Sequence, residues 1–156
     1  MIDSEIIFNK NILLAVDESE NARRAVIYVG QFLAGKKGFK VLILHVIRQP
    51  EEDYFPTVKD KDEWLKKSKL NADKLLEEYR QILIKADFDP EDVSVRSTLR
   101  YCPSLAECII AERDETEYST LVVGRQGISR SEEFLFGSIS SRIVNHARNC
   151  TVWVVE

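Results

Sequence analysis

Short, unbroken apolar runs alternate with segments of helical periodicity along the chain, and few folds accommodate that order. The runs at 11–16 and 41–46, and a shorter one at 121–123, contain almost no polar residue. A strand without polar alternation is typical of a parallel sheet that is buried on both faces. The candidate strand at 93–99 alternates instead, so we expect it near an edge of the sheet. A fifth candidate strand is 151–155.

Four helical segments separate these strands. We expect the first to follow an N-cap at Ser19 and to end at Gly35. A polar loop, 49–62, precedes the second, long amphipathic helix. Ser104 and Glu107 have the spacing of a capping box and predict the start of the third helix. The fourth follows the glycine loop described below.

Regular alternation with right-handed crossovers predicts the α/β class, with a doubly wound parallel sheet of five strands in three layers. The length fits one domain, 1–156. In such sheets ligands bind beyond the carboxyl ends of the strands, where the winding reverses. Asp17, the pair His45-Val46 and Gly124 lie at carboxyl ends of predicted strands. We therefore expect them to converge on one crevice.

Two glycine turns stand on either side of a nine-residue tether, 128–136. Glycine lets a ligand lie directly against the main chain. The second turn leads into a helix at Ser138, and a helix N-terminus offers unpaired N–H groups and a positive dipole end, which suit phosphate. The pattern favours a phosphate-binding loop. A structural role is the alternative, in which Gly124 ends a strand and Ser138 caps a helix.

Charge and composition exclude several classes of protein. The net charge of −4 argues against sequence-independent nucleic-acid binding, which needs a basic face. We predict no signal peptide and no membrane span, hence a cytoplasmic protein without a membrane partner. Cys102, Cys108 and Cys150 are odd in number and lack metal-ligand spacing. We expect them to be buried free thiols in a reducing compartment.

The chain resembles the universal stress protein family over nearly its whole length, 11–155. The most specific feature is the motif of the ATP-binding members: glycine, two residues, glycine, nine residues, glycine, then serine or threonine. Its spacing is intact here, in Gly124, Gly127, Gly137 and Ser138. Two further segments, 15–19 and 44–46, match the family in the same order.

The resemblance implies a sheet of order 3-2-1-4-5, similar to the adenine nucleotide alpha hydrolases, and bound ATP, with Mg as the expected counterion. Asp17 would contact the ribose or adenine side, and the backbone of Val46 the adenine edge. Main-chain N–H groups of the glycine loop would meet the phosphates. The implied nucleotide-binding residues are Ala15, Asp17, Val46, Val123, Gly124, Arg125, Gln126, Gly127, Gly137, Ser138 and Ile139.

The tether also carries two carboxylates, Glu132 and Glu133. If they face the ligand, they would weaken triphosphate binding or require a divalent cation. Arg125 and Arg130 would offset them, and carboxylates that point to solvent would have no effect. These glutamates favour an alternative function, a nucleotide-free dimeric interaction protein of the same fold.

Catalytic alternatives receive less support. Asp17, His45 and Ser138 suggest a hydrolase triad, but Ser138 lacks the glycine-x-serine-x-glycine elbow. His45 lies in an apolar strand pattern, which favours a packed, hydrogen-bonded histidine. The glycine-lysine-serine ending of a P-loop is absent. We therefore expect a nucleotide-binding module with no catalytic residue and no metal-ligand cluster, although slow hydrolysis of ATP stays open.

The last predicted strand suggests a homodimer. In the order 3-2-1-4-5 it forms an edge, and residues 152–155 are all apolar. An exposed apolar edge pairs readily with another chain. The alternative is that the long helix or the N-terminal ten residues cover it. The leading hypothesis is a dimeric, ATP-binding stress-response module that pairs through 151–155 and whose nucleotide state controls its interactions with a protein partner.

Overall fold

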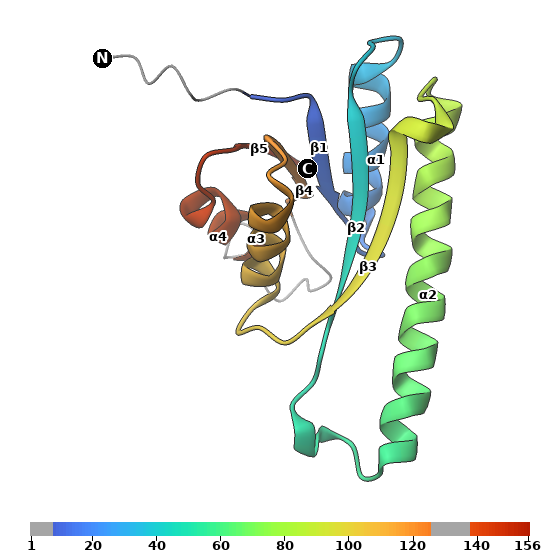
Figure 1. Ribbon diagram of the computed structural model, residues 1–156, viewed down its shortest axis with the longest axis vertical. Coiled ribbons are helices and arrows are strands. Elements are labelled where there is room, and N and C mark those ends of the chain that lie inside the picture. The colour runs from blue at the N-terminus through green and yellow to red at the C-terminus, as the bar shows by residue number, and fades with distance from the viewer. Residues whose placement is uncertain (1–7, 126–137) are drawn as a thin grey trace.

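Five parallel strands form one sheet in the order β3-β2-β1-β4-β5, which confirms the predicted topology (Figure 1). The computed structural model describes residues 8–125 and 138–156. The strands are β1 Asn11–Ala15, β2 Lys40–Arg48, β3 Val93–Arg100, β4 Thr120–Gly124 and β5 Thr151–Val155. No helix in this described part is long and apolar enough to cross a membrane.

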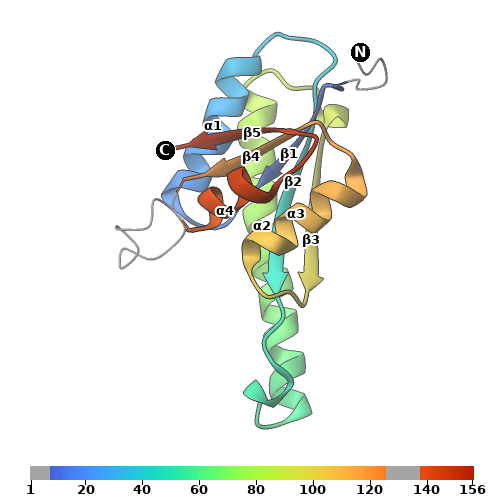
Figure 2. The same cartoon turned by 90° about the vertical axis from the view of Figure 1, so that its left-hand side faces the viewer.

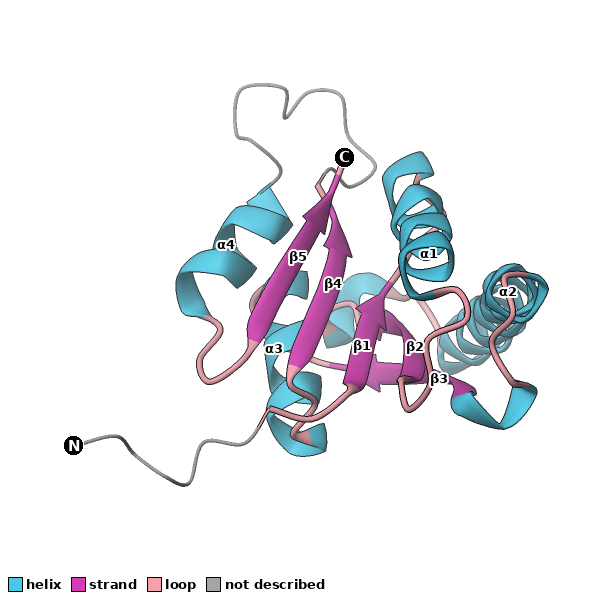
Figure 3. Cartoon of the chain, turned by 90° about the horizontal axis from the view of Figure 1, so that it is seen from above, coloured by secondary structure: helices cyan, strands magenta, loops and turns pink. Residues whose placement is uncertain are grey.

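Helices cover both faces of the sheet, so the predicted three layers are confirmed. Figure 3 shows α1 and α2 on one side of the strands and α3 and α4 on the other. The helices are α1 Glu20–Leu33, α2 Val58–Lys85, α3 Leu105–Thr116 and α4 Ser138–His146, with two short 3₁₀ turns at Glu52–Tyr54 and Pro90–Asp92.

The unbroken apolar runs arise because β1 and its neighbours are buried on both faces. Ile12 and Leu14 pack into the core beneath α1 and α2. Leu13 and Ala15 pack into a second core beneath α3 and α4. Successive side chains of a strand point to opposite faces, so a strand between two helical layers needs apolar residues at every position.

The predicted helix starts at Ser19 and Ser104 are confirmed by their caps. The Ser19 hydroxyl oxygen accepts a hydrogen bond from the N–H of Ala22 at 3.1 Å. That of Ser104 accepts from the N–H of Glu107 at 3.3 Å, and the Ser104 hydroxyl donates to the Glu107 carboxylate at 3.1 Å. Each cap satisfies an N–H group that the first turn of a helix would leave unpaired.

The predicted loop at 49–62 is wrong at its carboxyl end, where α2 already begins at Val58. Thr57 caps the helix, and its hydroxyl oxygen accepts from the N–H of Asp60 at 3.1 Å. The start was missed because this part of α2 extends past the sheet, together with the connection from β2 (Figure 1). No residue of α2 before Ala72 is buried. A helix with no buried face has no apolar stripe to reveal it.

The expectation of three free thiols is also wrong, because Cys102 and Cys108 form a disulfide. The connection between β3 and α3 folds back along the first turn of the helix and brings their Cα atoms within 5.8 Å, a separation typical of disulfides. Cys150 is free, and burial raises the pKa of its thiol.

Candidate functional site

The winding of the sheet reverses between β1 and β4. β1 leads into α1 on one face, while α4, which follows β4 in the chain, lies on the other (Figures 2 and 3). A small crevice lies beyond the carboxyl ends of these two strands. This is where open α/β sheets bind ligands.

Six of the eleven residues predicted to bind nucleotide line this crevice. They are Ala15, Asp17, Val46, Val123, Gly124 and Ile139. They come from the ends of three neighbouring strands, the turn after β1 and the first turn of α4. The structure thus brings together side chains that are up to 124 positions apart in the sequence.

The other five predicted residues have different outcomes. Gln126, Gly127 and Gly137 lie outside the described residues, as does the tether with its two glutamates. Ser138 is the first residue of α4, directly before Ile139 at the crevice. Arg125 does not line the crevice. Its guanidinium pairs with the carboxylate of Glu156 at 2.7 Å, beside the end of β5.

Two hydrogen bonds fix Asp17 at the crevice. Its carboxylate accepts from the N–H of Ser19 at 2.8 Å, within the turn that starts α1. Its carbonyl oxygen accepts from the Tyr79 hydroxyl at 2.7 Å. Tyr79 was not among the residues predicted for the site. Its position on α2 gives no sign that its hydroxyl reaches the site, because the contact depends on how α2 packs.

The environment of Tyr79 favours the neutral phenol. Burial and, second, the negative charge of Asp17 raise the pKa of Tyr79 to about 12. The phenol therefore keeps its proton at any pH at which the protein functions, and it donates that proton to the Asp17 carbonyl.

His45 lines the crevice as a packed, hydrogen-bonded side chain, as the sequence suggested. Its Nδ1 lies 2.9 Å from the carbonyl oxygen of Val16. A carbonyl only accepts, so Nδ1 carries the proton and, in the neutral ring, Nε2 is left as an acceptor. The ring is thus tied to the backbone just after β1 and not to the carboxylate of Asp17. This argues against the hydrolase triad, in which a carboxylate would orient the histidine.

Gly124 ends β4 where no side chain fits. A Cβ on this residue would lie 2.7 Å from the carbonyl carbon of Asn21 and 2.9 Å from the nitrogen of Ala22. Those atoms belong to the backbone of the first turns of α1, so they cannot move aside as a side-chain end would. Close packing of strand and helix explains this glycine without a ligand, and it also sets the width of the crevice.

The two ends of the glycine loop are held together. The hydroxyl of Ser140, a buried residue in the first turn of α4, donates to the carbonyl oxygen of Arg125 at 2.9 Å. The N–H of Arg125 donates to the carbonyl oxygen of Val155 in β5 at 2.7 Å. Arg125 and the first turn of α4 are thus held to one another and to β5.

The remaining wall of the crevice is apolar. Leu105 and Ile109 of α3 face Ile139 of α4 across it, and an adjoining open groove continues from Asp17 along α2 as far as Trp64. Among the described residues, no group of three or more His, Cys, Asp or Glu side chains could hold a metal ion. The apolar walls suit a flat, uncharged ring. The carboxylate and the polar backbone suit hydroxyl groups attached to it.

The fold and this crevice define a doubly wound α/β protein with a crevice at the switch point between β1 and β4. The sequence gives the family. The model of the Universal stress protein family matches residues 9–156, and the chain belongs to this family. A putative universal stress protein of Staphylococcus aureus (strain USA300) is 32% identical over 148 residues, which are 94% of this chain and 84% of that protein.

Solved structures confirm the fold class. The hypothetical protein MJ0577 superposes with a TM-score of 0.77 at 24% identity, over 96% of each chain. A universal stress protein solved in complex with cAMP superposes with a TM-score of 0.67 at 23% identity, over 94% of this chain and 96% of that one.

We expect Gly124→Ala to destabilise the protein, because the new Cβ meets helix backbone at 2.7 Å. Overpacking of this kind costs about 1–3 kcal/mol of unfolding free energy. Denaturation with urea measures this loss. A variant as stable as the parent would contradict the packing role, and glycine would then be needed at this position only for ligand access.

Tyr79→Phe removes the hydrogen bond to Asp17, and we expect it to lower the unfolding free energy by about 1 kcal/mol at neutral pH. The raised pKa of Tyr79 favours the native state fully below pH 10, the unfolded value, and this advantage is lost as pH rises. By pH 12 the stability of the wild type relative to the variant should have fallen by about 2 kcal/mol, which makes the variant the more stable protein there.

Urea denaturation of both proteins from pH 8 to pH 12 checks this prediction, since other groups that titrate there cancel in the difference. Parallel curves for the two proteins would contradict it.

Proposed function

We propose that this chain is a nucleotide-binding regulatory module that takes ATP with Mg in the crevice between β1 and β4. The observation that carries the proposal is the convergence of six predicted residues, from four segments of the chain, on the switch point of the sheet. The fold relative solved with cAMP, an adenine nucleotide, supports the same class of ligand.

The walls of the crevice suit the nucleoside. Val46, Leu105 and Ile139 offer apolar surface to a flat base. The carboxylate of Asp17 accepts one hydrogen bond from Ser19, and a carboxylate has room for further donors, such as the hydroxyls of a ribose. Tyr79 holds the backbone of Asp17 and the Ser19 N–H holds its carboxylate, which reduces the entropic cost of binding.

The phosphates are assigned to the glycine loop and the start of α4. Ile139 lies at the crevice, so the N-terminus of α4 opens onto it, and its N–H groups and dipole favour an anion. Arg125 is paired with Glu156, so the proposal assigns the neutralisation of phosphate to backbone N–H groups and to Mg. Gln126, Gly127 and Gly137 complete the proposed loop. We assign no catalytic residue.

A freshly purified sample should release ATP on denaturation, and the emptied protein should bind ATP with Mg. Gly127→Val places a branched side chain where the proposed loop needs its backbone against the phosphates, so we expect at least a tenfold loss of affinity, about 1.4 kcal/mol or more. Mass spectrometry of the released molecules and calorimetric titration measure both. Val144→Ala, an exposed change on α4, is the control and should bind as the parent does.

If neither method detects a nucleotide, the proposal fails and the nucleotide-free interaction protein takes its place. Release of phosphate from ATP that disappears on substitution of Ser138 would instead make the protein an ATP-hydrolysing enzyme. The cytoplasmic location stays a prediction.

We also propose that two copies pair through β5. This strand forms an edge of the sheet, and the α2 helix lies at the opposite edge, along β2 and β3 (Figure 1). Among the described residues, the N-terminal segment does not cover β5 either, since the N–H of Asn9 donates to the Ser119 hydroxyl at the amino end of β4. The edge is therefore available to a second chain.

Aromatic residues enlarge the apolar surface beside this edge. The rings of Phe32 and Trp153 meet edge to face, with centroids 5.6 Å apart, and Tyr28 stacks on Phe32. Both α1 rings are exposed, as is Val154 on the strand. Exposed aromatic clusters next to an unpaired strand are typical of interfaces.

Val154→Lys should convert dimers to monomers, because it places a charge on each copy at the centre of the paired edges. Sedimentation equilibrium measures the effect. Val144→Lys is the matched control, since Val144 is 55% exposed and Val154 is 41% exposed, but Val144 lies on α4. An unchanged dimer in the Val154 variant, or a monomeric parent, would refute pairing through β5.

A further inference from the structure

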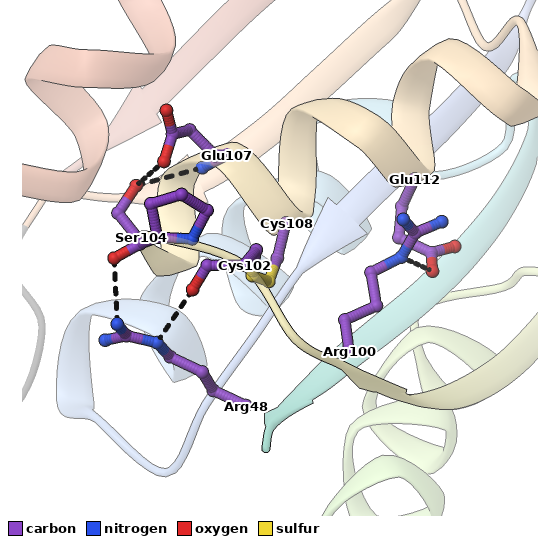
Figure 4. Close-up of a disulfide and its surroundings, with 8 residues drawn as sticks. Arg48, Arg100, Cys102, Ser104, Glu107, Cys108 and Glu112 are labelled. Atoms are coloured by element: carbon purple, nitrogen blue, oxygen red, sulfur yellow. Dashed lines mark hydrogen bonds and ion pairs between the residues drawn. A yellow bond between two sulfur atoms is a disulfide. The ribbon is translucent and has the colours of Figure 1, made fainter. Parts of the chain in front are cut away.

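The disulfide lies at the start of α3, next to the crevice. Cys102 precedes the N-cap Ser104 by two residues, and Cys108 is the fourth residue of the helix (Figure 4). In many helices an apolar contact between a residue just before the N-cap and the fourth helical residue, the hydrophobic staple, fixes how the chain enters the helix. Here a covalent bond has that role, so its cleavage would free the entry to α3.

The two cysteine residues differ in their exposure to solvent. Cys108 is fully buried in the core beneath α3, in the cluster that also contains Ala15 and Val46. Cys102 is partly exposed and borders an open hollow together with Arg48 and Tyr101. A reagent in this hollow therefore approaches the disulfide from the side of Cys102 and not from that of Cys108.

The same few residues connect the disulfide to the crevice. Leu105 and Ile109, on either side of Cys108 in α3, line the crevice wall. Arg48, two residues after Val46 in β2, donates to the carbonyl oxygens of Cys102 at 3.3 Å and Pro103 at 2.8 Å (Figure 4). The entry to α3 is thus held by one covalent bond and by hydrogen bonds from the strand that ends at the crevice.

We propose that Cys102–Cys108 is a reversible dithiol–disulfide site whose state sets how tightly the crevice holds nucleotide. This affinity rests on the function proposed above. In the disulfide state the first two turns of α3, with Leu105 and Ile109, are fixed before the ligand arrives. In the dithiol state the Cys102 segment loses its covalent tie and keeps the weaker hydrogen bonds from Arg48, so the ligand must order it further. If the predicted cytoplasmic location holds, a transient disulfide is the expected kind, because disulfides of cytosolic proteins are commonly catalytic or redox-sensing.

The chemistry needs a dithiol reductant and balances in two steps. One thiolate of the reductant attacks the Sγ of Cys102, the disulfide breaks, and the Sγ of Cys108 leaves as a thiolate that takes up a proton. The second thiol of the reductant, as a thiolate, then attacks the reductant's other sulfur atom, which is bonded to Cys102 in the mixed disulfide. The Cys102 thiolate leaves and is protonated. Two electrons pass to the protein and the reductant becomes a cyclic disulfide.

The test compares the full chain in the disulfide form with the same protein after dithiothreitol. Alkylation and mass spectrometry should show two more labelled thiols after reduction, at Cys102 and Cys108. Hydrogen exchange should become faster at the amides of residues 105–109. Affinity for ATP with Mg should fall by about threefold to tenfold, as expected when one or two wall side chains must be ordered on binding.

Two serine variants separate the disulfide from general thiol effects. Cys102→Ser should bind ATP as the reduced parent does, with no response to dithiothreitol. Cys150→Ser, which changes the free cysteine, should keep the full response. Should the first variant fold poorly, the reduced parent provides the same comparison without a substitution.

The outcomes distinguish this inference from the function on which it rests. Loss of nucleotide binding in both redox forms would reject the proposed function, and hydrogen exchange at residues 105–109 would still decide whether reduction frees α3. Equal exchange in the two forms, equal affinities in a protein that binds ATP, or alkylation of both cysteines without reductant would each overturn the redox site.

Discussion

Strand β4 and helix α1 approach so closely that residue 124 has no room for a side chain, and the crevice depends on this contact. The Asn21 backbone occupies the space that a Cβ would need. This approach sets where α1 begins relative to β4, and the α1 cap at Ser19 in turn fixes the carboxylate of Asp17. A glycine that packing requires is also the glycine that leaves the strand end open to a ligand, so neither role excludes the other.

Topology could be predicted from the sequence because it depends on local patterns. β1 needs apolar residues at every position, since both of its faces are covered, and Ser19 and Ser104 cap their helices from within three residues. The start of α2 was predicted wrongly because a local pattern is missing there. Thr57 is a good N-cap, but the turns that follow it bury nothing, so helical periodicity gives no signal there.

The site was predicted in part, and the division has a physical cause. The carboxyl ends of parallel strands must meet at one edge, so Asp17, Val46 and Gly124 could be placed together without coordinates. No comparable rule predicts contacts that depend on how distant elements pack. The Tyr79 hydroxyl and the pairing of Arg125 with Glu156 span 62 and 31 positions, and nothing in either local sequence indicates them.

Regulation by a nucleotide requires a physical path from the crevice to a surface, and α3 together with β4 provides one. The first turn of α3 forms the crevice wall. Near its end, the guanidinium of Arg113 donates to the carbonyl oxygens of Arg148 at 2.9 Å and Asn149 at 2.7 Å, just before β5. From β4, the N–H of Arg125 reaches Val155 in β5 itself. Under the proposed function, a ligand that shifted either element would act on the strand at the edge of the sheet, where we propose that two copies pair.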